Sequence, residues 1–213
     1  MVAKINYHKI LESTLEEVKT KFVGRKPDLL LHSCCGPCSS YVVSFLMNFF
    51  NIYIFYYNPN IYPEKEYLKR KEEQLKLLSY TDFKDIKFVD GKYDHLLFLE
   101  EVKGYEQCFE GGNRCDICFK MRLKETVEMA KKLRLDYFST TLTVSPHKNS
   151  DKINAIGKEL ENKYFCNYLF SDFKKKDGYK KSIELSKKYN LYRQNYCGCE
   201  FSLKKDCILY KKN

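Results

Sequence analysis

The sequence has no tryptophan, few residues that break regular structure and no long apolar run. Its 213 residues include only 5 prolines and 9 glycines, and no stretch rich in Pro, Gly or Ser divides the chain. No internal repeat is found either, so we expect one domain over residues 1–213 rather than a solenoid or a pair of linked domains. No apolar stretch reaches the roughly 18 residues that a membrane-spanning helix needs, so no membrane partner is expected.

The first residues, MVAKINYHKI, lack the features of a secretory signal, which are a basic flank, an apolar core and a small-residue cleavage site. We therefore expect a cytoplasmic protein. A chain of this length also folds without covalent staples, so its 10 cysteines are not explained by structural disulfides. In the cytoplasm, clustered cysteines indicate metal binding or redox chemistry.

The charge is strongly positive, with 38 Lys and Arg against 28 Asp and Glu and a formal net charge of +10. Such an excess suits a polyanionic partner, but a solvated lysine-rich surface gives the same total, and the charge alone leaves both open. The 18 tyrosines and 15 phenylalanines supply material for a core and for stacking on bases.

Helical and extended patterns alternate along the chain, which predicts an α/β fold with parallel strands and right-handed crossovers. We expect a three-layer sandwich with a mostly parallel sheet and a metal site at the carboxyl edge of the strands. Residues 1–27 form a helical N-terminal extension. The expected helices are 4–22, 39–50, 63–79, 115–135, 149–162 and 177–189, and the expected strands are 28–33, 51–58, 86–90, 136–142 and 164–170.

The stretch HSCCGPCSS, residues 32–40, follows the first expected strand and precedes a helix. Ligands of open α/β sheets gather at such junctions. Backbone N–H groups and the positive end of a helix lower thiol pKa values there, so Cys34 and Cys35 are candidate metal ligands.

Cys115 and Cys118 lie three positions apart at the expected beginning of a helix, so their sulfurs can face the same side. Together with Cys34 and Cys35 they supply four thiolates, the usual complement of a [4Fe–4S] cluster. Zinc also accepts four thiolates, although paired Cys-x-x-Cys knuckles are its usual pattern. The spacing favours the cluster and leaves zinc open.

Cys197 and Cys199 flank a single glycine. A disulfide between them closes a very small ring, whose strain makes it more reducible than a structural bridge, and Gly198 permits the backbone angles that this ring demands. The pair therefore suits an electron relay, and the alternative is a second metal site or no role. Cys38 is a candidate third thiol for a second mononuclear iron or zinc. The isolated Cys108, Cys166 and Cys207 are expected to be small buried hydrophobes.

Five motifs in this order carry a resemblance to a known family: LHSCCGPCSS, YNPNIYPEKEYLKRKEEQ, CDICFKMRL, STTLTVSPHKNSDKI and YRQNYCGCEFS. From about Leu29 to Ser202 the chain resembles the QueH-type epoxyqueuosine reductases. Residues 1–27 fall outside the resemblance and either add tRNA contacts or cover the edge of the sheet.

The resemblance implies the last step of queuosine formation in tRNA, the reductive removal of an epoxide oxygen, carried out without cobalamin. It also implies a fold similar to the PP-loop nucleotide-binding superfamily, a partner tRNA that carries epoxyqueuosine in its anticodon loop, and an external electron donor. The implied redox-active pair is Cys197 and Cys199. The implied ligands of a [4Fe–4S] cluster are Cys34, Cys35, Cys115 and Cys118.

Other polar residues are weaker candidates. Asp116 and His147 are possible proton donors, and His32 is either catalytic or a satisfied histidine under the sheet. Phosphate contacts are conceivable at Arg114, Arg122 and Lys148. A phosphate track with interleaved Phe173 and Tyr179 is predicted at Lys174, Lys175, Lys176, Lys180 and Lys181.

Two other functions compete with the reductase. A PP-loop thiolase needs a Gly/Ser-rich phosphate cradle after the first strand, and this chain has bulky thiols there, which disfavours ATP chemistry. A zinc-stabilised PP-loop-like tRNA-modifying or RNA-binding protein, with every cysteine structural, remains the alternative.

Overall fold

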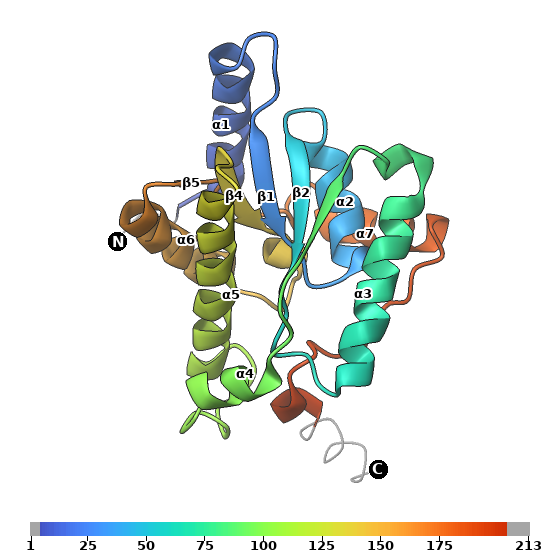
Figure 1. The fold of residues 1–213 in the computed structure, drawn as a ribbon, viewed down its shortest axis with the longest axis vertical. Helices are drawn as coiled ribbons and strands as arrows, with labels where there is room; N and C mark the ends of the chain where they lie inside the picture. Colours follow the sequence, from blue (N-terminus) through green and yellow to red (C-terminus); the bar gives the residue numbers. More distant parts are fainter. Residues whose placement is uncertain (1–4, 204–213) are drawn as a thin grey trace.

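One parallel sheet organises residues 5–203, the part of the chain that this computed structural model describes (Figure 1). The strand order is β3-β2-β1-β4-β5, and each neighbouring pair is parallel. The predicted α/β fold class is therefore confirmed. The strands are β1 (Asp28–His32), β2 (Asn51–Tyr56), β3 (Lys87–Asp90), β4 (Tyr137–Thr140) and β5 (Asn167–Tyr168).

Helices cover both faces of the sheet, because successive side chains of a strand point to opposite faces. Leu29 and Leu31 pack with α1, α2, α3 and α7, whereas Leu30 packs with α5 and α6 on the other face. None of the described helices is long and apolar enough to cross a membrane. The helices are α1 (Tyr7–Lys21), α2 (Gly36–Leu46), α3 (Glu64–Ser79), α4 (His95–Glu101), α5 (Asn113–Lys132), α6 (Ser150–Tyr164) and α7 (Gly178–Lys188).

The sheet order reverses between β1 and β4, and this reversal places the site. Chain connections leave these two neighbouring strands in opposite directions across the sheet, which opens a crevice at their carboxyl ends. The cysteine-rich turn follows β1, and residues 141–148 follow β4. The C-terminal segment, drawn in red in Figure 1, passes the same end of the sheet.

The element boundaries differ from the prediction where local geometry decides them. Helix α2 begins at Gly36 rather than residue 39, because Pro37 suits the first turn of a helix. Phe165 takes a left-handed conformation with φ of 51° and ends α6, so the strand expected over 164–170 keeps only two residues. Helix α4 was not predicted, since its seven residues are too few to show a clear period.

Helix α1 belongs to the core and does not merely extend it. Leu11, Leu15 and Val18 are buried with the residues of β1 and α2, and they follow the predicted helical spacing. Helix α1 therefore covers a face of the sheet at the central strand β1, not the edge of the sheet that was one of the two roles expected for residues 1–27.

Replacement of Leu15 by alanine should therefore lower the free energy of unfolding by about 2–5 kcal/mol, because a fully buried leucine is lost and leaves a cavity. Chemical denaturation followed by circular dichroism measures this change. Ser13→Ala, on the exposed side of the same helix, should change stability by less than about 0.5 kcal/mol. Equal stabilities of the two variants would show that α1 does not hold the core.

Candidate functional site

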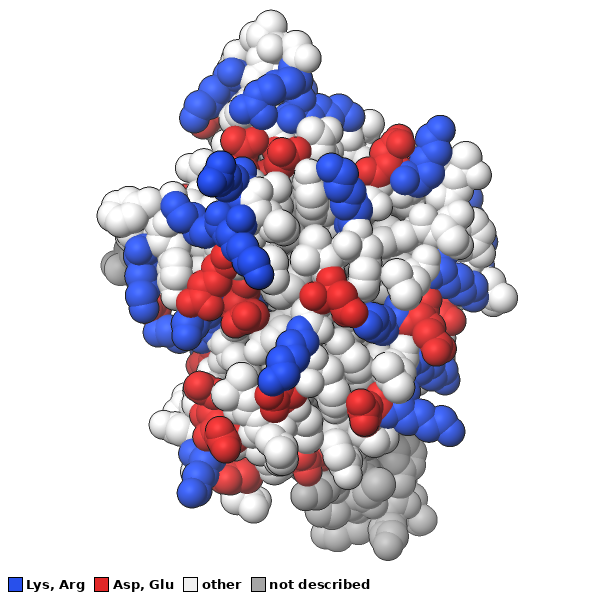
Figure 2. All heavy atoms as spheres, viewed as in Figure 1, with Lys and Arg blue, Asp and Glu red and all other residues white. Residues whose placement is uncertain are grey.

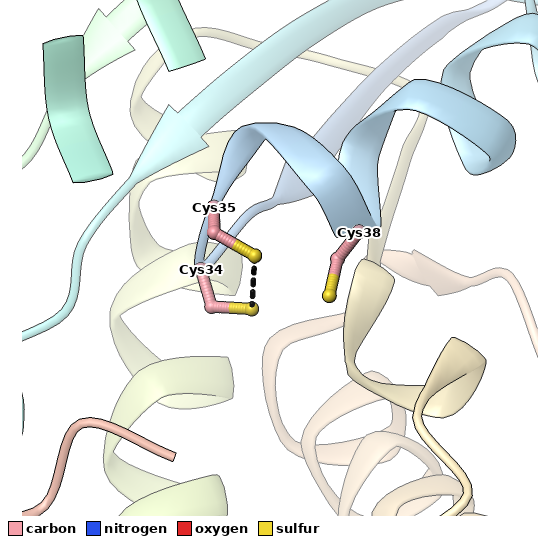
Figure 3. Close-up of side chains that lie close together, drawn as sticks. All are labelled: Cys34, Cys35 and Cys38. Carbon is pink, nitrogen blue, oxygen red and sulfur yellow. Dashed lines mark hydrogen bonds between the residues drawn. The ribbon is translucent and has the colours of Figure 1, made fainter. Parts of the chain in front are cut away.

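Three cysteines gather where β1 ends and α2 begins. Cys34 and Cys35 lie in the turn, Cys38 lies in the first turn of α2, and their sulfur atoms all lie within 4.8 Å of one another (Figure 3). The Sγ atoms of Cys34 and Cys35 are 3.7 Å apart. Such a group can bind a metal ion, and it lies at the carboxyl edge of the sheet as predicted.

This cysteine turn, residues 33–38, is anchored to α3. The side chains of Ser33 and Ser39 both donate to Oε1 of Gln74, at 2.8 and 2.7 Å. The backbone of Gly36 lies so close to α3 that only glycine fits, because a Cβ atom there would lie 2.7 Å from the carbonyl oxygen of Glu73. The turn therefore has a fixed position relative to α3.

The three thiols of this group shift one another's pKa values in opposite directions. Hydrogen bonds from Cys35 and Cys38, aided by the charge of Lys148, hold the pKa of Cys34 well below its ordinary value. Donation to Cys34 raises the pKa of Cys35 to about 11 and also raises the pKa of Cys38. Gln194 adds a further hydrogen bond, from Nε2 to the sulfur of Cys35 at 3.1 Å.

Arg122 of α5 lies buried beside the thiols with only 3% of its surface exposed. Its Nη2 donates to Oδ1 of Asn58 at 2.9 Å, and its Nη1 lies 3.8 Å from the sulfur of Cys118. Within residues 5–203 it forms no ion pair with a carboxylate. It is therefore a buried cation rather than a surface side chain, and the sulfur of Cys118 is one of its neighbours.

His32 is a satisfied buried histidine. Its Nε2 lies 3.2 Å from Nε of Arg122 and 3.1 Å from the carbonyl oxygen of Tyr57, and its Nδ1 forms a hydrogen bond of 2.9 Å with Oγ1 of Thr140. Burial, reinforced by the Arg122 charge, lowers the pKa of His32 to about 3. The ring stays neutral and links the ends of β1 and β4.

Lys148 is a second cation that faces thiols. Burial opposes its charge, but the sulfurs of Cys34, Cys197 and Cys38 outweigh that effect and raise the pKa of Lys148. Like Arg122, it has no carboxylate partner among the residues that the structure describes.

The cysteines of α5 flank the same region without joining the group of three. Cys115 accepts a hydrogen bond from the Gly111 backbone at 3.2 Å and packs against the apolar cluster that contains Cys34 and Cys35. Cys118 lies one helical turn further and packs with Cys199. Burial raises the pKa of both α5 thiols.

The two cysteines of the Cys197–Gly198–Cys199 loop are in contact. The backbone N–H of Cys199 lies 3.4 Å from the sulfur of Cys197, and a hydrogen bond from the Cys199 thiol is the main reason that the pKa of Cys197 falls to about 6. The same contact raises the pKa of Cys199. Gly198 has a φ of +106°, as the sequence led us to expect for this turn.

Two adjoining cavities bring these thiols to one space. The larger, about 430 Å³, contacts Cys34 and Cys38, and the narrower one contacts Cys115, Cys118 and Cys199. Thus the carboxyl end of β1, the first turns of α5 and the C-terminal loop meet. The residues common to both cavities are Glu110, Arg122, His147, Lys148 and Cys197.

The other predicted polar residues take different places. Asp116 is bound to Lys152 at 2.6 Å and lines neither cavity. His147 is exposed and lines both cavities. Arg114 is buried and donates to the carbonyl oxygens of Glu106 and Cys108, which makes it a structural support of the preceding loop rather than a phosphate contact.

The predicted phosphate track is broken up. Phe173 is buried in the core at 2% exposure and is wrong as a stacking surface, whereas Tyr179 does line the larger cavity. Lys174 pairs with Asp172, and Lys176 pairs with Glu12. Figure 2 shows one face of the molecule, on which basic and acidic side chains alternate. Of the isolated cysteines, Cys166 is buried as expected, Cys108 is partly buried and Cys207 lies outside the described residues.

Several site residues were missed from the sequence. Arg70 and Gln74 lie on the buried face of α3, whose other residues are mostly charged. Their helical spacing with Tyr67 and Leu77 was the sequence signal that could have shown that they are buried. Gln194 and Glu110 carry no periodic or spacing signal, because each stands in a loop.

The comparison with known sequences agrees with this arrangement. The sequence model described as Epoxyqueuosine reductase QueH matches residues 29–205. The chain belongs to the QueH epoxyqueuosine reductase family. The match begins at β1 and includes each cysteine of the site, whereas α1 precedes it.

Individual relatives of the QueH family match almost the whole chain. An epoxyqueuosine reductase QueH from Staphylococcus epidermidis is 40% identical over 214 residues, covering 98% of this chain and 89% of the relative. The Streptococcus pyogenes protein of the same name is 38% identical, covering 99% and 84%. The Thermotoga maritima protein is 36% identical, covering 82% and 90%.

The contrast between Cys197 and Cys199 predicts selective alkylation. In reduced, metal-free protein, the rate at which iodoacetamide labels Cys197 should rise with a midpoint near pH 6 and level off about one pH unit higher, because its lowered pKa makes the reactive thiolate the main form above the midpoint. Cys199 should label slowly at pH 7, since its pKa is raised. Mass spectrometry of tryptic peptide 194–204, which holds only these two cysteines, measures the ratio. Buried Cys166 is an internal control, and equal labelling of Cys197 and Cys199 at pH 7 would contradict the assignment.

Proposed function

We propose that this protein removes the epoxide oxygen of epoxyqueuosine in tRNA, giving queuosine, with an iron–sulfur cluster and without cobalamin. Membership of the QueH family supports an epoxyqueuosine-reducing oxidoreductase. The observation that carries the cluster is the meeting of seven site cysteines with two cations that lack carboxylate partners among the described residues.

The positive charges at the site suit an anionic iron–sulfur cluster. Burying Arg122 without an acidic partner is costly, because an uncompensated charge is poorly solvated in a protein interior. Lys148 adds a second positive charge at the same space. A cluster with four thiolate ligands is an anion and would supply the missing negative charge.

The proposed cluster ligands are Cys34 and Cys35 from the turn after β1 and Cys115 and Cys118 from α5. Cys38 belongs to the close group of three sulfurs and is the proposed ligand of a second metal, iron or zinc. When bound here, the cluster would supply electron transfer, and the second metal would supply a Lewis acid for the epoxide oxygen.

Cys197 and Cys199 are the proposed source of the electrons and protons that the reaction consumes. Conversion of the epoxide to an alkene and water consumes two electrons and two protons. Oxidation of the two thiols to a disulfide releases two electrons and two protons, so the equation closes without another reactant. An external electron donor then returns the disulfide to the dithiol. The proposed proton donors to the departing oxygen are His147 and Glu110, because both residues line both cavities.

The larger cavity is the proposed place for the modified base. Bases of single-stranded loops are bound splayed out, against aromatic rings and hydrogen-bonding side chains. Tyr179 and Tyr196 line this cavity, together with Gln194 and Asn195. The Oε1 atom of Gln194 is buried and has no hydrogen-bond partner among residues 5–203, so it can accept from an N–H or O–H group of the substrate. A tRNA substrate implies a cytoplasmic protein.

A zinc-stabilised RNA-binding protein is the second candidate, because a close group of three sulfurs also suits zinc. The two candidates differ in metal content and in turnover.

Anaerobically purified protein should be brown and should remove one oxygen mass from the nucleoside of epoxyqueuosine-containing tRNA when a strong reductant is present. Cys197→Ser should keep the iron–sulfur absorbance and stop turnover, because the remaining thiol cannot form the disulfide. Nucleoside mass analysis and visible absorbance are the measurements. A colourless protein that contains only zinc, or an unchanged nucleoside with an intact cluster, would reject the reductase.

Arg122→Met should weaken binding of the cluster by about 10–100-fold, as for other groups that support metal ligands. Arg122→Lys should lose less, since the positive charge remains. The measurement is iron and sulfide content after anaerobic reconstitution against a competing chelator. Lys120→Met, on the exposed side of α5, is the matched control and should keep full iron content. Full iron in Arg122→Met would show that the buried cation does not compensate a cluster.

A further inference from the structure

The buried face of α3 carries one charged residue, Arg70, that lies outside both site cavities. Arg70 is only 1% exposed, lies between the buried residues Tyr67 and Gln74, and lines neither site cavity. A guanidinium buried to this degree needs partners that compensate its charge. Glu66, one turn earlier, provides one through an ion pair of 2.7 Å with Nε of Arg70.

The other end of Arg70 holds the C-terminal thiol loop by its backbone. Nη1 donates to the carbonyl oxygen of Cys197 at 3.2 Å, and Nη2 donates to the carbonyl oxygen of Tyr196 at 3.3 Å. The guanidinium also lies 4.9 Å from the ring centre of Tyr196. A planar fork with two donors fixes both the position and the orientation of this peptide segment.

Gly198 is confined at the same place. Its carbonyl oxygen accepts from the Tyr62 backbone N–H at 2.8 Å. A Cβ atom on Gly198 would lie 2.9 Å from Cγ1 of Ile61 and 3.0 Å from Nη1 of Arg70. The turn between the two thiols is thus enclosed by α3 and by the loop that leads into it.

The next buried polar residue of α3 holds the other thiol segment. Gln74 accepts from Ser33 and Ser39, on either side of the cysteine turn, and it lies four residues after Arg70. Residues at this spacing occupy the same face of a helix. One rigid face therefore sets the relative position of two thiol segments that are far apart in sequence.

We propose that Arg70 is a positioning residue for Cys197 and Cys199, which keeps their loop in the shape that allows the two sulfurs to bond. The inference rests on the proposed redox role of this pair. In the step that it serves, the S–H bonds of Cys197 and Cys199 break, one S–S bond forms, and two electrons and two protons pass to the epoxide, which leaves as alkene and water. Sulfurs must approach to about 2.05 Å with a defined dihedral angle, so a loosened loop closes less readily.

The test compares wild type, Arg70→Lys and Arg70→Met in anaerobic, cluster-loaded protein. After equilibration in glutathione or dithiothreitol redox buffers, thiols are blocked, and the mass of peptide 194–204 gives the disulfide-to-dithiol ratio of the pair. In Arg70→Met this ratio should fall about tenfold, which corresponds to about 30 mV for a two-electron couple. Turnover of epoxyqueuosine-containing tRNA should fall about 100-fold, with KM and iron content unchanged.

Arg70→Lys keeps the charge and can keep the ion pair with Glu66, but it cannot donate to both carbonyls. It should lie between wild type and Arg70→Met in ratio and in turnover, and it keeps the test valid if Arg70→Met does not fold. Lys65→Met, an exposed position on the same helix, should match wild type.

The outcomes separate the two proposals. If the disulfide-to-dithiol ratio of Cys197 and Cys199 is unchanged in both folded Arg70 variants, the positioning role is overturned. A ratio that shifts as expected, in a protein whose wild type leaves the epoxide intact, would support the positioning role and reject the proposed function.

Discussion

The organisation of this molecule depends on a positive charge buried among sulfur atoms. Arg122 lies against the carboxyl ends of β1 and β2, where it meets His32, Asn58 and Cys118. No carboxylate among residues 5–203 pairs with it, and a charge buried in this way is stabilised by an anionic neighbour. Burial is the main reason that His32 stays neutral, and the charge of Arg122 adds to it.

The sequence was sufficient to predict the layers of the fold, because apolar periodicity reports which face of an element is buried. Leu29, Leu30 and Leu31 are an example, since a continuous apolar run predicts a strand covered on both sides, as the structure confirms. Some short elements of the fold were not predicted correctly. Helix α4 has seven residues, and β5 depends on the left-handed Phe165, whose conformation no pattern encodes.

The cysteines of the candidate site could be named from the sequence, but the roles of the polar residues that hold them in position could not. Thiols are rare and their spacing is visible, so Cys34, Cys35, Cys115, Cys118, Cys197 and Cys199 were all singled out. Arg70, Gln74 and Arg122 are common residue types whose roles depend on partners between 35 and 127 residues away. For Arg70 and Gln74, the helical spacing with buried neighbours is a local signal of burial, but it does not identify the partners that these side chains bind.

The hydrogen bond from Gln194 to Cys35 joins residues 159 positions apart. Cys35 is only 1% exposed with this loop in place. The loop that carries Gln194 lies outside the sheet, so it can move without breaking a strand pair. Access of a metal ion or an oxidant to the sulfur of Cys35 therefore depends on how firmly the C-terminal loop is held rather than on the stability of the sheet.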